Sequence, residues 1–170
     1  MHTERVATER LSRRCRGAGD TFRWSDLKTP FFALAPMEEV TDTVFRRLVR
    51  RWSIRGGTDG PDVTMSEFTR VDEVSRSYEH DLRNRPPLGR LQFTSEERPI
   101  VVQLWGTRPE EFYRAAAAAE ALGFDGIDIN MGCPVKKIRK TGAGSALIRH
   151  PDRVGEIIAA CRAGSNLPLS

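Results

Sequence analysis

The chain has 170 residues, 39% of them hydrophobic and 29% charged, which suffices for one domain with a buried core. Its net charge of +4 suits a polyanionic partner such as nucleic acid without requiring one. Three widely spaced cysteines argue against a disulfide scaffold, and no apolar run is long enough to span a membrane. The N-terminus lacks the apolar core of a secretory signal, so we expect a cytoplasmic protein.

The first part of the chain differs from the rest. Residues 1–28 are charged and lack sustained periodicity, and we interpret them as an N-terminal tail before a domain at 29–170. Within that domain apolar runs alternate with helical patterns, and a polar segment at 75–98 indicates an excursion or a hairpin. In chain order, the patterns predict strands at 31–35, 63–67, 100–106 and 126–130, helices after Asp42, from Thr107 to Gly123 and from about Pro151 to Ala163, and the start of a fifth strand at 167–170.

The helix ends carry clear local signals. Thr41 and Asp42 are N-cap residue types in front of the first helix. We expect Thr107 to cap the second helix, because Pro109 then falls in its first turn and Gly123 is a natural terminator.

Alternating strands and helices imply parallel strands covered by helices, and both a doubly wound sheet and a (β/α)8 barrel fit this order. Met37, Glu67, Gln103 and Asn130 lie at or just past the ends of successive strands. A barrel presents chemistry at the carboxyl ends of many strands, whereas a doubly wound sheet gathers it at one switch point, so we favour the barrel. Closure needs about eight strands. We therefore expect about the first four β/α units of a TIM barrel, truncated before strand five.

The richest stretch runs from Asp128 to Pro134. An apolar strand ends in Asn130, and a Gly132-Cys133-Pro turn then fixes a thiol above the strand ends, with free backbone before the cysteine and a restricted φ after it. Two interpretations of Cys133 fit this spacing equally, a reactive thiol on a loop and a small buried hydrophobe. A zinc site is disfavoured, because no second cysteine or histidine stands at ligand spacing.

Three segments carry a family signature. They are Ala35 to Asp42 followed by Phe45-Arg46, Val102 to Gly106, and Asp128 to Pro134 followed by Lys136-Lys137 and Gly142 to Leu147. In this order and at these separations they resemble the tRNA-dihydrouridine synthase family, over roughly 31–168. Glu39 departs from the glycine or small residue expected at its position. This departure affects the expected shape of the turn after the first strand and leaves the family resemblance intact.

The resemblance implies an NADPH-dependent flavin oxidoreductase that reduces uridine in tRNA to 5,6-dihydrouridine, with FMN bound over the barrel mouth. It implies that Cys133 is the general acid, which protonates C5 of uracil while hydride from reduced FMN reaches C6. An ordinary thiol, with a pKa of about 8.5, is mostly protonated at neutral pH and can donate. The implied cofactor-binding residues are Pro36, Met37 and Glu38 along the flavin ring, Gln103 at its edge, and Asn130 beside the flavin and the target base.

A basic run follows the cysteine. By composition it is a solvated face or a contact to a nucleic-acid backbone, and the resemblance to a tRNA enzyme favours the contact. The target base has to leave its stack to reach a flavin, which favours a uridine in a loop. The candidate tRNA-binding residues are Lys136, Lys137, Arg139 and Lys140.

Two other functions stay open on the sequence alone. One is a different FMN-barrel oxidoreductase, similar to dihydroorotate dehydrogenase, that acts on a free pyrimidine. The other is a non-catalytic RNA-binding fragment. The later flavin contacts of the family and its C-terminal tRNA-binding domain have no counterpart among these 170 residues. We therefore expect an incomplete fragment that binds FMN weakly on its own.

Overall fold

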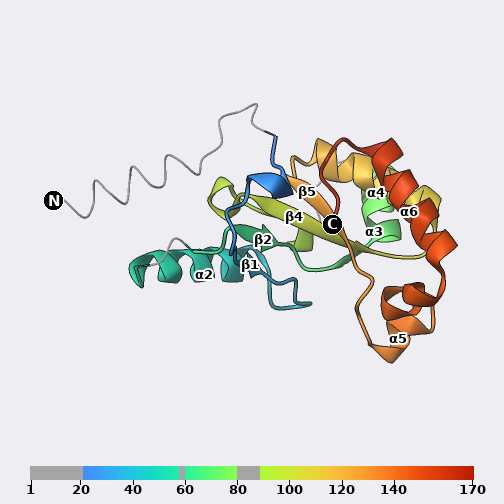
Figure 1. Ribbon diagram of the computed structural model, residues 1–170, viewed down its shortest axis with the longest axis horizontal. Coiled ribbons are helices and arrows are strands. Elements are labelled where there is room, and N and C mark those ends of the chain that lie inside the picture. Colours follow the sequence, from blue (N-terminus) through green and yellow to red (C-terminus); the bar gives the residue numbers. More distant parts are fainter. Residues whose placement is uncertain (1–20, 58–59, 80–88) are drawn as a thin grey trace.

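The computed structural model describes residues 21–57, 60–79 and 89–170, which form one parallel sheet flanked by helices (Figure 1). The strands are β1 (Ala33–Leu34), β2 (Val63–Met65), β3 (Thr69–Arg70), β4 (Ile100–Trp105) and β5 (Gly126–Ile129). The α-helices are α2 (Thr43–Arg55), α3 (Val71–Glu79), α4 (Pro109–Ala121), α5 (Lys136–Arg139) and α6 (Pro151–Gly164). Short 3-10 turns are η1 (Trp24–Asp26), η2 (Gly89–Leu91), η3 (Ser95–Glu97) and η4 (Gly144–Arg149).

All strand pairs of the sheet are parallel. β4 has β5 along one edge and β2 followed by β3 along the other, and β1 pairs with β2. Beyond β5, Leu169 forms a parallel bridge with Ile127, which confirms the predicted start of a fifth strand. Parallel strands that alternate with helices in this way match the expected partial (β/α)8 barrel.

A β-bulge separates β2 from β3. The register pairs on the two sides of it are Thr64 with Ile100 and Thr69 with Leu104. The β2–β3 side therefore holds one more residue than β4 between these pairs, which defines a bulge at residues 66–68. The Ser66 hydroxyl oxygen fills the gap by accepting the Gln103 backbone N–H at 3.2 Å. Because bulges change the direction of side chains, this one affects the orientation of Glu67, which lies within it.

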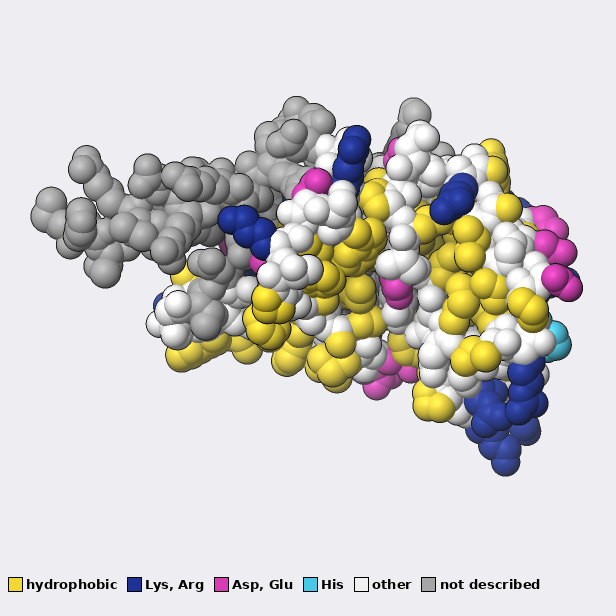
Figure 2. Space-filling view, viewed as in Figure 1, with side chains coloured by type: hydrophobic (Ala, Val, Ile, Leu, Met, Phe, Trp, Pro, Cys, Tyr) yellow, Lys and Arg dark blue, Asp and Glu magenta, His cyan; other side chains and the backbone are white. Residues whose placement is uncertain are grey.

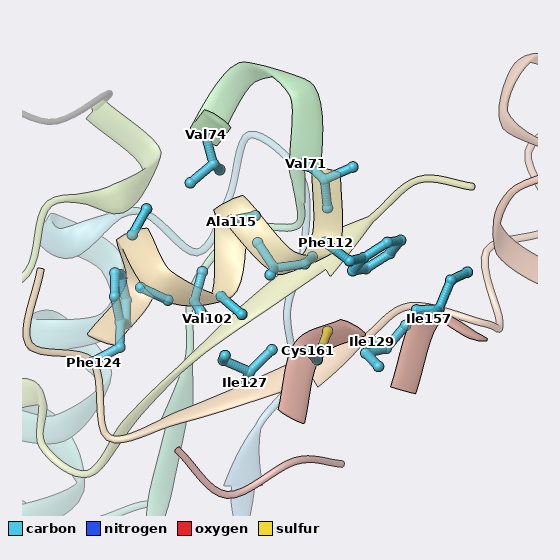
Figure 3. Close-up of a cluster of buried hydrophobic side chains, with 14 of the residues drawn as sticks. Val71, Val74, Val102, Phe112, Ala115, Phe124, Ile127, Ile129, Ile157 and Cys161 are labelled. Carbon is cyan, nitrogen blue, oxygen red and sulfur yellow. The ribbon is translucent and has the colours of Figure 1, made fainter. Parts of the chain in front are cut away.

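The main core lies between the sheet and helices α3, α4 and α6 (Figure 3). β4 is buried along nearly its whole length, as expected for a parallel strand covered on its faces. Alanines on the inner side of α4 are fully buried, and their small side chains let this helix pack closely. Each buried leucine or isoleucine stabilises the fold by about 1.5–3 kcal/mol. The labelled residues of Figure 3 are Val71, Val74, Val102, Phe112, Ala115, Phe124, Ile127, Ile129, Ile157 and Cys161.

The helix ends agree with the sequence in one case and differ in another. Asp42, one of the two cap candidates in the sequence, caps α2, since its Oδ1 accepts the Phe45 backbone N–H at 2.7 Å. The predicted cap of α4 is wrong by one residue, because Arg108 rather than Thr107 holds the N-cap position without a side-chain bond. Pro109 follows at the first helical position, where its fixed φ suits a helix start. None of the described helices combines the length and apolarity needed to cross a membrane.

Helix α3 corrects the predicted excursion at 75–98. It begins at Val71 and runs into that segment, directly after β3. Val71 and Val74 are buried against the main core, whereas the neighbouring side chains are polar. Two apolar positions in a polar segment give too weak a periodicity to predict a helix. The rest of the excursion at 80–88, with His80, lies outside the described residues.

Part of the predicted tail packs on the sheet. Phe22 is 1% exposed and lies in a second cluster with Val63 and Val101. Its ring meets Trp24 edge to face, with 5.1 Å between the ring centroids. The packed part of the chain therefore includes residue 22, within the segment assigned to the tail at 1–28.

β1 is shorter and more exposed than the apolar run predicted as a strand at 31–35 suggests. Phe32 is 70% exposed, and β1 itself spans two residues. Within the described residues β1 pairs with β2 alone, so it forms an edge of the sheet. An edge strand has a neighbouring strand on one side only, so it is less covered than an inner strand.

Candidate active site

The turn after β1 is tied together by Thr41, which is fully buried. The Thr41 Oγ1 accepts the Met37 backbone N–H at 2.9 Å and donates to the Met37 carbonyl oxygen at 3.0 Å. The guanidinium of Arg46 donates to the Thr41 carbonyl oxygen. The turn therefore has a fixed backbone shape, while the side chains of Met37 and Glu38 are exposed.

A buried ion pair supports this turn. The Arg46 Nε lies 2.6 Å from Glu97 Oε2, and both side chains are completely buried. Glu97 also accepts the Thr43 hydroxyl at 2.6 Å and the Thr94 backbone N–H at 2.7 Å. Arg46 donates in addition to the Gln92 carbonyl oxygen at 2.6 Å. These bonds satisfy both charges, which a buried pair requires to be stable.

Glu67 links the turn to the bulge of the second strand. Its Oε2 accepts the Glu39 backbone N–H at 2.5 Å, and its side chain is 7% exposed. Glu39 has a φ of 59°, the left-handed region in which glycine carries no steric cost. This conformation explains why the family signature leads us to expect a small residue at position 39. The Glu67 bond stabilises the turn despite the larger side chain.

Gln103, Asp128 and Asn130 form a connected row of polar side chains on β4 and at the end of β5. Gln103 is in register with Asp128, and residues 128 and 130 share one face because side chains alternate along a strand. The Gln103 Nε2 donates to Asp128 Oδ2 at 2.5 Å, and the Asn130 Nδ2 donates to Gln103 Oε1 at 3.0 Å. Gln103 is 8% exposed, so these bonds are largely shielded from water.

The row continues to the backbone of Cys133. Asn130 Oδ1 accepts the backbone N–H of Gly132 at 3.2 Å and that of Cys133 at 3.0 Å. On the other side the Ser145 N–H donates to the Cys133 carbonyl oxygen at 3.0 Å. The peptide groups on both sides of the Cys133 Cα are therefore held by hydrogen bonds.

Gly144 packs directly on this cysteine. It has a φ of 59°, and a Cβ at this position would lie 2.7 Å from the Cys133 carbonyl oxygen and 3.2 Å from its Cβ. No residue other than glycine fits there without displacing Cys133. The Gly142-Ala143-Gly144 segment therefore supports the cysteine loop.

The two described cysteines differ in environment. Cys133 is half-buried, against Phe68, Ile138 and Ala143. Cys161 is fully buried inside α6, and burial raises the pKa of its thiol to about 12. Cys161 is thus a packing residue, whereas Cys133 retains access to solvent.

The basic run forms an exposed patch on the short helix after the cysteine loop. α5 projects from the rest of the molecule in Figure 1, and a dark blue patch covers the same place in Figure 2. Within the described part of the chain, these side chains form no ion pair. The α5 patch consists of Lys136, Lys137, Arg139 and Lys140.

The model of the family described as "Dihydrouridine synthase (Dus)" matches residues 33–170. The chain belongs to the dihydrouridine synthase family. It is 45% identical over 147 residues to a protein of Staphylococcus aureus (strain COL) named "Probable tRNA-dihydrouridine synthase". It is 46% identical over 147 residues to a protein of Bacillus subtilis (strain 168) named "Probable tRNA-dihydrouridine synthase 2". Each match covers 86% of this chain and 42% of the relative.

The structure of this family member brings together some of the residues singled out in its sequence. Gln103, Asn130 and Cys133 are joined by direct hydrogen bonds, and the turn at residues 36–38 connects to Glu67 through the next residue. The α5 patch belongs to a separate, exposed surface that follows the cysteine loop.

Sequence reasoning missed Asp128 as a member of this row. A signal for it exists, because Asp128 and Asn130 are two residues apart on one predicted strand and must share a face. The Arg46–Glu97 pair has no such signal, since the two residues come from distant segments.

Proposed function

We propose that this chain belongs to a flavin-dependent tRNA-dihydrouridine synthase, which reduces uridine in tRNA to 5,6-dihydrouridine with NADPH as the reductant. The observation that carries the proposal is Cys133, a half-buried thiol held through its backbone by Asn130 and Ser145 at the carboxyl edge of a parallel sheet. The names of the Staphylococcus and Bacillus relatives support uridine in tRNA as the substrate.

The donor set on this edge suits the ring of FMN. After its two internal bonds, the Gln103 amide retains one N–H and one oxygen lone pair. This donor and acceptor match the imide edge of a flavin, which offers an N–H beside a carbonyl. The turn of Pro36, Met37 and Glu38 adds backbone groups and an exposed methionine side chain at the same end of the sheet. NADPH is assigned on the family resemblance.

Cys133 is the proton donor in this proposal. Bound FMN in its reduced form supplies the hydride for C6 of uracil, and the thiol gives its proton to C5. An ordinary thiol is mostly protonated at neutral pH and so can act as a general acid. Asn130 and Ser145 keep the loop in place, which reduces the entropy lost in reaching the reactive arrangement. A catalytic thiol also favours a reducing compartment, so we assign the protein to the cytoplasm.

The α5 patch is our candidate for the tRNA backbone contact. It carries four cations, immediately after the loop of the catalytic cysteine. Neutralising phosphates releases counterions, which gives affinity without base specificity. Selection of the uridine then depends on extruding the base toward the cysteine.

The test separates the proposal from its two rivals. The chain spans 42% of the length of the Bacillus subtilis relative. For the assay it is therefore extended with the remaining sequence of that relative, which gives what we call the extended protein. The purified protein is incubated with FMN, NADPH and either unmodified tRNA or free pyrimidines, and dihydrouridine is measured by nucleoside mass spectrometry. We expect the product in tRNA alone. Reduction of free pyrimidine would instead support the dihydroorotate dehydrogenase-like alternative, and a colourless protein that binds tRNA would support the non-catalytic one.

A further inference from the structure

We propose that Asp128 is a positioning residue that fixes the orientation of the Gln103 and Asn130 amides and thereby decides what each offers to a ligand. The three side chains form one line of hydrogen bonds that ends at the Cys133 backbone. Asp128 bonds to Gln103 and to Ser170, and within the described residues it forms no hydrogen bond to Cys133. Its effect is therefore exerted through the two amides.

The carboxylate of Asp128 determines which atom of each amide donates and which accepts along this line of hydrogen bonds. An ionised carboxylate has acceptors only, so the group that faces it must donate. Gln103 consequently turns its Nε2 toward Asp128 Oδ2, 2.5 Å away, and its Oε1 faces the other way. Asn130 meets that oxygen with its Nδ2 at 3.0 Å. One acidic side chain thus orients two amides in series.

The other end of the line imposes the same direction. The backbone groups of Gly132 and Cys133 are donors, so the Asn130 atom that faces them must be its oxygen. Ser170 holds the carboxylate by donating its hydroxyl to Asp128 Oδ1 at 2.9 Å. With a carboxylate at one end and two N–H groups at the other, turning over either amide would oppose like groups.

The orientation of the two amides determines which hydrogen-bonding groups they offer to a ligand. Asn130 Oδ1 already accepts two bonds, and one N–H of its Nδ2 is used, so Asn130 can offer a ligand one donor. It therefore recognises a carbonyl oxygen. Gln103 offers one donor and one acceptor, which suits an imide. Uracil and flavin both present such groups, and the assignment of these ligands rests on the proposed function.

The acid and the amide can be exchanged in a double variant that keeps the net charge and side-chain sizes of the wild type, whereas each single variant changes the charge by one. In Asn130→Asp an acceptor faces Gln103 Oε1, and Gln103 cannot turn over because Asp128 requires its Nε2. In the double variant Asp128→Asn, Asn130→Asp, Gln103 can turn over, because Asn at 128 donates and Asp at 130 accepts. The backbone donors of Gly132 and Cys133 still find an acceptor.

The measurement is the urea midpoint of the chain and of its Asp128→Asn, Asn130→Asp and double variants. We expect the double variant to unfold at a higher urea concentration than Asn130→Asp, although it carries one more substitution. This holds also if Asn130→Asp alone fails to fold. A double variant that is no more stable than Asn130→Asp overturns the proposal. The orientation of the two amides would then have no effect on the stability of the fold.

A flavin titration of the extended protein distinguishes positioning from a structural role. The double variant recovers stability but has no side-chain N–H at position 130, so we expect its FMN affinity or its rate with tRNA to stay at least about tenfold below wild type. Full recovery of both would contradict the recognition argument. If the wild-type protein itself binds no flavin while the urea result holds, the proposed function fails and the orienting role of Asp128 stands.

Discussion

At the scale of single residues, the two described thiols should differ in reactivity. The thiolate is the nucleophile toward iodoacetamide, and burial raises the pKa of Cys161 to about 12. We expect alkylation of the folded chain at about pH 8 to modify Cys133 and to spare Cys161. Peptide mass spectrometry reads each site separately, and labelling in urea is the control in which both react. Equal labelling of the two cysteines in the folded chain would contradict the assigned environments.

Glu39 provides a second test at this scale. A left-handed φ costs a non-glycine residue about 1–2 kcal/mol, and glycine loses about 0.5–1 kcal/mol more backbone entropy on folding. Glu39→Gly should therefore raise the free energy of unfolding by about 0.5–1 kcal/mol in urea denaturation. Glu38→Gly is the matched control and should lower it, because Glu38 lies outside the left-handed region. A loss of stability in Glu39→Gly would show that this backbone conformation is not strained.

At the scale of elements, the Arg46–Glu97 pair joins α2 to η3, which precedes the central strand. Removing one partner leaves a buried charge, so Arg46→Met should cost about 3–5 kcal/mol of unfolding free energy. The adjacent Arg47 pairs with Glu96 at 3.5 Å on the surface, and Arg47→Met should cost less than about 1 kcal/mol. Chemical denaturation measures both variants. Similar losses in the two would show that burial does not set the strength of these pairs.

The α5 patch makes a prediction about tRNA. If it contacts phosphates, Lys137→Gln in the extended protein should weaken tRNA binding and reduce the slope of log affinity against log salt by about 0.7–0.9. Lys28→Gln, an exposed lysine distant in sequence from this patch, serves as the control. Filter binding over a range of salt concentrations provides the slopes. An unchanged slope for Lys137→Gln would indicate a solvated face that binds no tRNA.

The sequence predicts much of this element order, for reasons that lie in local pattern. β4 is apolar apart from Gln103, and α6 begins at Pro151, so the sequence patterns predict both elements close to their observed bounds. α3 is not predicted, because its place depends on packing Val71 and Val74 against another helix. The exposure of β1 likewise depends on its position at the sheet edge, which no local pattern specifies.

The candidate site is predictable to a similar degree. Gln103, Asn130 and Cys133 stand out by type and by strand position, and the structure connects them. The link from Glu67 to the first turn and the packing of Gly144 on the cysteine depend on contacts between distant segments. Sequence identifies these residues as candidates, but their partners follow from the fold.

At the scale of the whole molecule, the parallel sheet places a thiol at the carboxyl edge of its strands, and the proposed reaction requires that thiol as a proton donor. The most direct test is dihydrouridine formation in tRNA by the extended protein, its Cys133→Ala variant and its Cys161→Ala variant. We predict that Cys133→Ala lowers the rate at least about a hundredfold, as removal of a general acid does, while Cys161→Ala keeps it. Unchanged dihydrouridine formation by Cys133→Ala would contradict the account.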